Sequence, residues 1–117
     1  MSKEMYDEQY EQTCFQLITA SGGAKSSYMA AIEKAKEGEF DEARNLIKEG
    51  DKMLNEAHAP HADMVAKEAA GEGCPLSLIL THAEDQMMST EVFKTLACEF
   101  IDLYEKLFQL GVMKKGE

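Results

Sequence analysis

The sequence predicts an all-α protein whose protomer is an antiparallel bundle of three long helices. Apolar residues recur every three or four positions over three stretches of about 30 residues each. The chain holds only two prolines, at positions 60 and 75, and no Asn-Gly or Asp-Gly pair that would indicate a β-hairpin. The stretches are separated by short turns, which place neighbouring helices antiparallel.

Composition describes one domain with an acidic surface. The 117 residues suffice for one domain and are 44% hydrophobic and 29% charged, so a core is expected and disorder is not. The formal net charge of −10 argues against nucleic acid and anionic membranes as partners, because Lys and Arg are too few to neutralise phosphates.

No stretch approaches about 18 uninterrupted apolar residues, so we expect no membrane insertion. The polar, acidic N-terminus is unlike a signal peptide. Cys14, Cys74 and Cys98 show no CxxC spacing. We therefore expect reduced thiols and a cytoplasmic location.

The first helix is expected over about residues 5–36. Ser21, Gly22 and Gly23 lie in its middle, where two glycines weaken a helix by about 1 kcal/mol each. They favour a slight bend or a close helix–helix approach, and a true break is the alternative. The stripe expected to face the core is Tyr6, Tyr10, Thr13, Leu17, Ala20, Ala24, Tyr28, Ala31 and Ala35.

The second helix is expected over about residues 40–69, after a turn at Gly38. Gly50 is a mild interruption. Pro60 removes one backbone hydrogen bond and crowds the carbonyl of Glu56, but the apolar stripe continues in register beyond it, so we expect a kink and not a stop. That stripe is Ala43, Ile47, Leu54, Ala57, His61 and Val65.

The third helix is expected over about residues 76–110, with Pro75 in its first turn. Its apolar surface is wider than one seam requires, because Leu78, Leu96 and Leu103 lie on one side and Ile79, Ala97 and Phe108 on the other. A three-helix bundle of this length is thin, so we expect a homo-oligomer. On a helical wheel one meridian is formed by Leu78, Phe93, Leu96, Phe100, Tyr104 and Leu107.

A polar patch interrupts this meridian. His82 lies on it, Gln86 and Ser89 lie within about 40° of it, and Asp85 lies about 60° to one side. Burying polar side chains without partners costs about 1–3 kcal/mol each. The patch therefore indicates a satisfied internal network or a working site.

In an antiparallel hairpin that turns near Gly73, His61 lies about 12 residues before the turn and Asp85 about 12 after it, so both should lie at similar heights along the helices. His58 is matched in the same way with Met88, so all three histidines and Asp85 should lie at neighbouring heights.

Three interpretations of these histidines compete. They can be buried structural side chains. They can be metal ligands, with His58 and His61 joined by His82 or Asp85. His82 can also be a nucleophile that holds a phosphoryl group, with Gln86 or Ser89 as donors to the phosphoryl oxygens. Asp85 would repel that group unless a cation neutralised it.

Several sequence blocks resemble a known family: GAKS at 23–26, AKEGEFDEA at 35–43, NEAH at 55–58, AKEAAGE at 66–72 and HAEDQMM at 82–88. In order and spacing, over roughly residues 10–108, they are similar to the lactose/cellobiose-type enzyme IIA of the bacterial phosphoenolpyruvate-dependent sugar phosphotransferase system. The resemblance implies that residues 1–117 form a single enzyme IIA domain, with three-helix protomers assembling into a nine-helix homotrimer.

The resemblance also implies a function. A phosphocarrier of this family takes a phosphoryl group from the histidine-containing phosphocarrier protein and passes it to a cysteine of enzyme IIB during uptake of a lactose-, cellobiose- or chitobiose-type sugar. His82 matches the phosphorylated histidine. Asp85 matches the aspartate that binds one Mg²⁺ per trimer on the three-fold axis.

Four residues depart from the family pattern: Glu84, Gln86, His61 and Pro60. Glu84 replaces a glutamine, and an ideal helix points it about 160° away from His82. Gln86 replaces a second histidine and can donate to a phosphoryl oxygen but cannot titrate. We therefore expect Gln86, Ser89 and His61 to stabilise the phosphoryl group, with the ring of His61 supplying what Gln86 lacks.

Two functions of other classes remain as alternatives. AIEKAKEGEFDEA at 31–43 resembles part of a tetratricopeptide repeat, which would make the chain a non-catalytic protein-interaction module, although no period near 34 recurs. The other is a metal-binding bundle that uses His58, His61 and His82.

Overall fold

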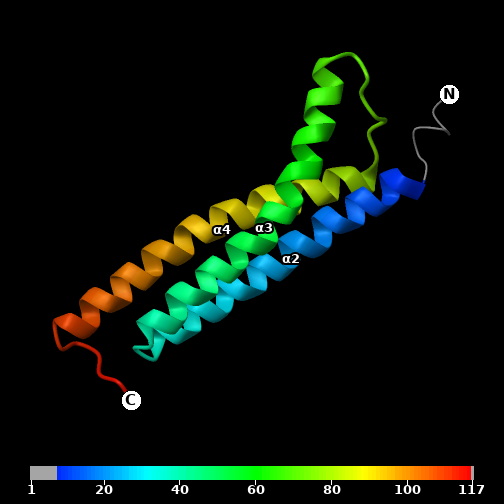
Figure 1. Ribbon diagram of the computed structural model, residues 1–117. Helices are drawn as coiled ribbons and strands as arrows, with labels where there is room; N and C mark the ends of the chain where they lie inside the picture. Colours follow the sequence, from blue (N-terminus) through cyan, green and yellow to red (C-terminus); the bar gives the residue numbers. More distant parts are fainter. Residues whose placement is uncertain (1–7, 117) are drawn as a thin grey trace.

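The computed structural model describes residues 8–116, and this part contains three α-helices and no strand (Figure 1). The helices are α2 (Glu8–Lys36), α3 (Phe40–Ala69) and α4 (Leu78–Gln109). They run antiparallel in chain order, so the predicted fold class is confirmed for the protomer. The predicted helix start near residue 5, and Tyr6, lie outside the described residues.

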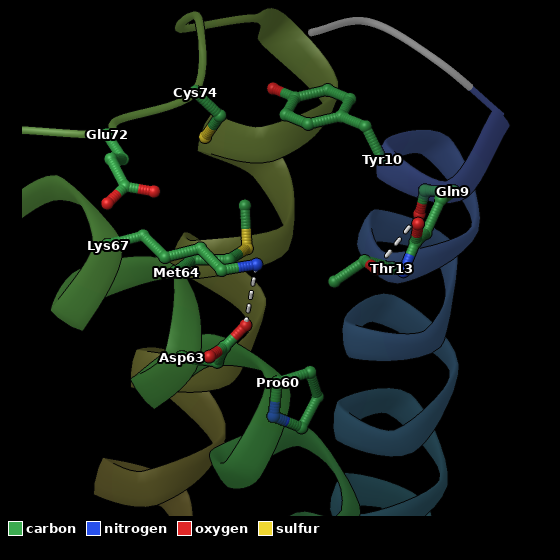
Figure 2. Close-up of a pocket in the computed structure, with 9 residues that line it drawn as sticks. All are labelled: Gln9, Tyr10, Thr13, Pro60, Asp63, Met64, Lys67, Glu72 and Cys74. Carbon is green, nitrogen blue, oxygen red and sulfur yellow. Dashed lines mark hydrogen bonds and ion pairs between the residues drawn. The ribbon is translucent and has the colours of Figure 1, made fainter.

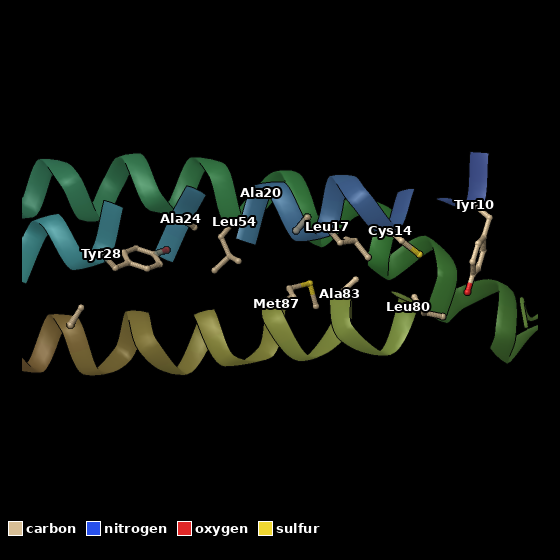
Figure 3. Packing of buried hydrophobic residues seen from close by; sticks show 12 residues of the cluster. Tyr10, Cys14, Leu17, Ala20, Ala24, Tyr28, Leu54, Leu80, Ala83 and Met87 are labelled. Carbon is tan, nitrogen blue, oxygen red and sulfur yellow. The ribbon is translucent and has the colours of Figure 1, made fainter. Parts of the chain in front are cut away.

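Helix α2 is the central element of the bundle, because α3 and α4 both pack against it. Its predicted stripe is confirmed: Thr13 is half-buried and the other described members are buried. Figure 3 shows the larger core cluster, in which α2 faces α4 across apolar side chains. The buried stripe comprises Tyr10, Leu17, Ala20, Ala24, Tyr28, Ala31 and Ala35.

The small residues in the middle of α2 allow close approach of both neighbouring helices. Thr90 Oγ1 of α4 donates a hydrogen bond of 3.3 Å to the carbonyl of Ser21. A Cβ added to Gly23 would lie 3.0 Å from Met53 Sδ of α3. Helix α2 continues through this segment, so the close-approach interpretation holds and the alternative of a break is wrong.

Tyr28 occupies a tight contact between α2 and α3. Its ring is fully buried, and a Cβ at Gly50 would lie 2.5 Å from Cε1 of that ring. The phenol donates a hydrogen bond of 2.7 Å to Asp51 Oδ1, and Lys94 Nζ of α4 lies 3.1 Å from the same oxygen. Gly50 therefore permits this contact, and α3 continues through it.

The buried phenol predicts a loss of stability in alkali. Burial, and then the hydrogen bond with Asp51, raise the pKa of Tyr28 above its usual range. The unfolded phenol ionises near about pH 10 and the folded one stays protonated, so this contribution is present below about pH 10 and is lost as pH rises further. Urea unfolding at about pH 8 and about pH 11 should show a smaller fall for Tyr28→Phe than for the wild type. Equal falls would contradict this assignment.

Helix α3 passes Pro60 without ending and bends there, so that its last turns leave the bundle (Figure 1). The predicted kink is confirmed. Burial in α3 ends at Ala57, and His61 and Met64 are only half-buried. Val65 is 54% exposed, so its predicted place in the core stripe is wrong, because the bend turns this face away from α2.

Helix α4 begins at Leu78 and not at the predicted position near residue 76. Ser77 is extended and caps the helix, since its Oγ accepts a hydrogen bond of 3.1 Å from the backbone N–H of Leu80. Pro75 therefore lies before the helix, and its carbonyl accepts a hydrogen bond of 2.9 Å from the Tyr10 hydroxyl.

Helix α4 has apolar side chains on two faces. The face against α2 and α3 buries Leu80, Ala83, Met87, Thr90, Ala97 and Ile101. The predicted meridian of α4 lies at the edge of this core: Leu78 is 87% and Leu96 is 52% exposed. Phe93 and Tyr104 of the same meridian are half-buried and pack against the core. The large apolar residues exposed on the other side of α4, the outer face, are Leu78, Met88, Val92, Leu96, Phe100 and Leu103.

Candidate functional site

The polar patch lies on the outer face of α4. His82, Asp85 and Ser89 are all exposed and continue the spacing of the apolar residues, because positions 78, 82, 85, 89, 92 and 96 alternate by four and three. This is the spacing of a coiled-coil seam. A buried internal network is therefore the wrong interpretation for these three side chains in the protomer.

Asp85 and His82 occupy different parts of this face. On an ideal helix, Asp85 lies about 20° from the line through Leu78 and Leu96, whereas His82 lies about 40° from it on the opposite side. Asp85 and Gln86 follow His82 by three and four residues, so both are its neighbours on the helix surface. Gln86 lies further toward the core and is half-buried.

The two histidines of α3 face glutamates of α4. His61 Nε2 lies 2.9 Å from Glu84 Oε2, and His58 Nε2 lies 3.6 Å from Glu91 Oε1. A carboxylate only accepts hydrogen bonds, so Nε2 of His61 carries the proton and donates it. Within the protomer, Nε2 of His61 is therefore hydrogen-bonded to Glu84 and not to His82.

The pairing of His61 with Glu84 was absent from the sequence-based prediction, which placed His61 near the height of Asp85. The predicted height was right to within one residue. The helical wheel also turned Glu84 away from His82, and that direction points it toward α3. Combining these two signals would have found the pair.

No group of three or more His, Cys, Asp or Glu side chains in residues 8–116 is arranged to hold a metal ion. The hypothesis that His58, His61 and His82 form a metal site within one protomer is therefore wrong. Asp85 contributes one exposed carboxylate per chain. Oxygen donors of this kind suit Mg²⁺, but one carboxylate cannot enclose an ion, so a site at Asp85 needs further copies of the chain.

The thiols at the core are poor nucleophiles. Burial raises the pKa of the Cys14 thiol, and the nearby Cys74 raises it further. Burial also raises the pKa of Cys98. Both thiols therefore stay protonated at neutral pH. All three cysteines are free, as the sequence predicted.

The family model of the PTS system lactose/cellobiose-specific IIA subunit matches residues 12–105. The lichenan-specific phosphotransferase enzyme IIA component of Bacillus subtilis is 38% identical over 101 residues, which cover 86% of this chain and 92% of that protein.

Two solved structures are also similar to this chain. The crystal structure of the PTS cellobiose-specific enzyme IIA from Bacillus anthracis has a TM-score of 0.84 and 40% identity, covering 92% of this chain and 98% of that one. The IIA(chitobiose) of the Escherichia coli IIA(chitobiose)–HPr complex has a TM-score of 0.72 and 34% identity, covering 83% and 94%.

None of the helices in the described part combines the length and apolarity needed to cross a membrane.

The family match spans most of the three-helix bundle, including the whole of the polar patch on α4. Relatives named as phosphotransferase components are similar over nearly their full length. The chain belongs to the lactose/cellobiose-specific IIA family of the phosphotransferase system, whose members are phosphotransfer proteins.

Proposed function

We propose that this chain is a phosphocarrier in which His82 accepts a phosphoryl group from HPr, the histidine-containing phosphocarrier protein, and passes it to a cysteine of enzyme IIB. The observation that carries the proposal is the position of His82. It is an exposed imidazole on α4, within the region matched by the family. A partner protein can therefore reach it.

The transfer is a pair of displacements at phosphorus. An unprotonated ring nitrogen of His82 attacks the phosphorus of the donor's phosphohistidine, the new N–P bond forms and the donor's N–P bond breaks. The donor's imidazole takes a proton as it leaves, and the other ring nitrogen of His82 releases one. In the second step a thiolate of enzyme IIB attacks, an S–P bond forms and His82 leaves as neutral imidazole after it takes a proton. The side chains of Gln86 and Ser89 supply donors to the phosphoryl oxygens.

Support for the first partner comes from the IIA(chitobiose)–HPr complex, because that IIA is similar to this chain in fold and sequence. Enzyme IIB is the acceptor that the family resemblance implies. The carrier would work in the cytoplasm during uptake of a lactose-, cellobiose- or chitobiose-type sugar.

The outer face of α4 supports a homotrimer in which three α4 helices pack together in a nine-helix bundle. Its four–three spacing and its exposed large apolar side chains are features of a coiled-coil seam. Asp85 near the centre of that seam would bring three carboxylates together. The three Asp85 side chains would hold Mg²⁺, which would offset two of their three negative charges, while His82 at the edge stays accessible.

A chase experiment tests both steps, acceptance of the phosphoryl group and its transfer to enzyme IIB. The protein is phosphorylated by phosphoenolpyruvate with the general phosphotransferase proteins, purified, and then mixed with enzyme IIB of a family system. We expect an acid-labile phosphoryl group that leaves the protein and appears on the cysteine of enzyme IIB. A phosphoryl group that stays on the protein, while a known family member transfers its own, would contradict the proposal.

A further inference from the structure

The last turns of α3, which follow Pro60, bury fewer side chains against the bundle than the rest of that helix. Pro60 lacks a backbone N–H, so one hydrogen bond of the helix is missing at the bend. From His61 to Ala70, His61 and Met64 are half-buried and residues 62, 63 and 65–70 are exposed. In the whole stretch from 61 to 74, Met64 and Cys74 are the apolar side chains that pack against the larger core cluster. Few apolar contacts hold such a segment, which favours local opening at low free energy.

A cavity of about 350 Å³ separates this segment from α2. In Figure 2, Pro60, Asp63, Met64 and Lys67 line one side of it, and Gln9, Tyr10 and Thr13 of α2 line the other. The ion pair of Lys67 with Asp63, at 3.2 Å, stays within α3 and does not cross the cavity. The last turns of α3 therefore overhang α2 with open space beneath them.

The chain is fixed again at the far side of this segment. The Tyr10 hydroxyl donates to the carbonyl of Pro75 and lies 2.7 Å from Ser77 Oγ, which caps α4. Residues 61–74 thus lie between a bend at Pro60 and an anchor at Pro75–Ser77. Movement of this segment can leave the start of α4 in place.

One polar contact joins this segment to another helix. Among the side-chain hydrogen bonds and ion pairs of residues 8–116, that of His61 with Glu84, at 2.9 Å, is the one between the last turns of α3 and α4. It is partly shielded, since the side chains are 19% and 39% exposed. The pair of His58 with Glu91 lies on the other side of Pro60.

From these four observations we propose that residues 61–74 form a lid over the cavity, hinged at Pro60 and held by the His61–Glu84 hydrogen bond as its latch. Breaking the latch frees the lid without unfolding the three-helix core. Glu84 lies two residues from His82, so the latch is at the height of the proposed phosphoryl acceptor. The proposal does not depend on His82 carrying a phosphoryl group.

Amide hydrogen exchange followed by mass spectrometry tests the latch. In Glu84→Ala, peptides covering 62–70 should exchange about five- to tenfold faster than in the wild type, the effect of losing one such hydrogen bond. Peptides covering 14–28 of α2 should keep their rates. Glu84→Gln should exchange like the wild type, because the amide oxygen still accepts from His61 although the charge is gone.

Glu91→Ala is the matched control, since it removes the corresponding pair before the hinge. It should leave peptides 62–70 unchanged. The proposal is overturned by unchanged exchange in Glu84→Ala, by equal acceleration in Glu84→Gln or Glu91→Ala, or by acceleration that extends to α2. Pro60→Ala tests the hinge: the restored N–H should slow exchange over 62–70, and an unchanged or faster rate would overturn the hinge.

Discussion

Leu96→Glu is expected to convert the proposed trimer into single chains. Leu96 lies in the middle of the outer face of α4 and is 52% exposed in the protomer, so its replacement leaves the protomer core intact. In a packed seam the substitution would bury three carboxylates without partners, and each uncompensated buried charge costs several kcal/mol. Sedimentation equilibrium should give about three times 13.0 kDa for the wild type and 13.0 kDa for Leu96→Glu.

Asn45→Glu is the control for this experiment. It adds the same charge at an exposed position of α3, outside the outer face of α4, and should keep the mass of the wild type. A wild-type mass of one chain would contradict the trimer. A Leu96→Glu variant that keeps the three-chain mass would show that another surface makes the interface.

Gly50→Ala is expected to destabilise the protomer by about 1–3 kcal/mol. The added methyl group would lie 2.5 Å from the ring of Tyr28, which is fully buried and tied to Asp51 by its hydroxyl. The ring cannot move aside without breaking the packing of α2 on α3. This overlap exceeds the gain of about 1 kcal/mol that alanine normally gives over glycine within a helix.

Gly22→Ala separates the two effects. A methyl group added at Gly22 would meet no atom within 4 Å outside the local backbone, so the helix gain of about 1 kcal/mol should appear unopposed. Urea unfolding of both variants at one fixed protein concentration provides the measurement. A stabilised Gly50→Ala would contradict the contact between Tyr28 and α3.

The helices were predictable because the spacing of apolar residues and the positions of the turn residues agreed along most of the chain. Gly38 lies in the turn between α2 and α3 and has a left-handed conformation. The buried positions of α2 are those of the stripe predicted for that helix. The start of α4 was placed too early because Pro75 suits a first helical turn, whereas the capping hydroxyl of Ser77 sets the boundary.

The orientation of α4 was harder to predict than its existence. A helix apolar on two faces has no single preferred direction, and the sequence does not reveal that Ala97 faces the core while Leu96 faces out. The core side of α4 mixes small residues such as Ala83 and Thr90 with Leu80 and Met87, while Leu96 and other large apolar side chains remain exposed. The helical wheel located the polar patch on α4, but whether the patch is exposed depends on which face of α4 packs against α2.

Phosphorylation of His82 is the direct test of the phosphocarrier proposal. The wild type, His82→Gln and His58→Gln are incubated with phosphoenolpyruvate and the general phosphotransferase proteins, and their intact masses are followed. We expect one phosphoryl group per chain on the wild type and on His58→Gln, and none on His82→Gln. An equal gain on His82→Gln, or no gain on the wild type beside a working family member, would contradict the account.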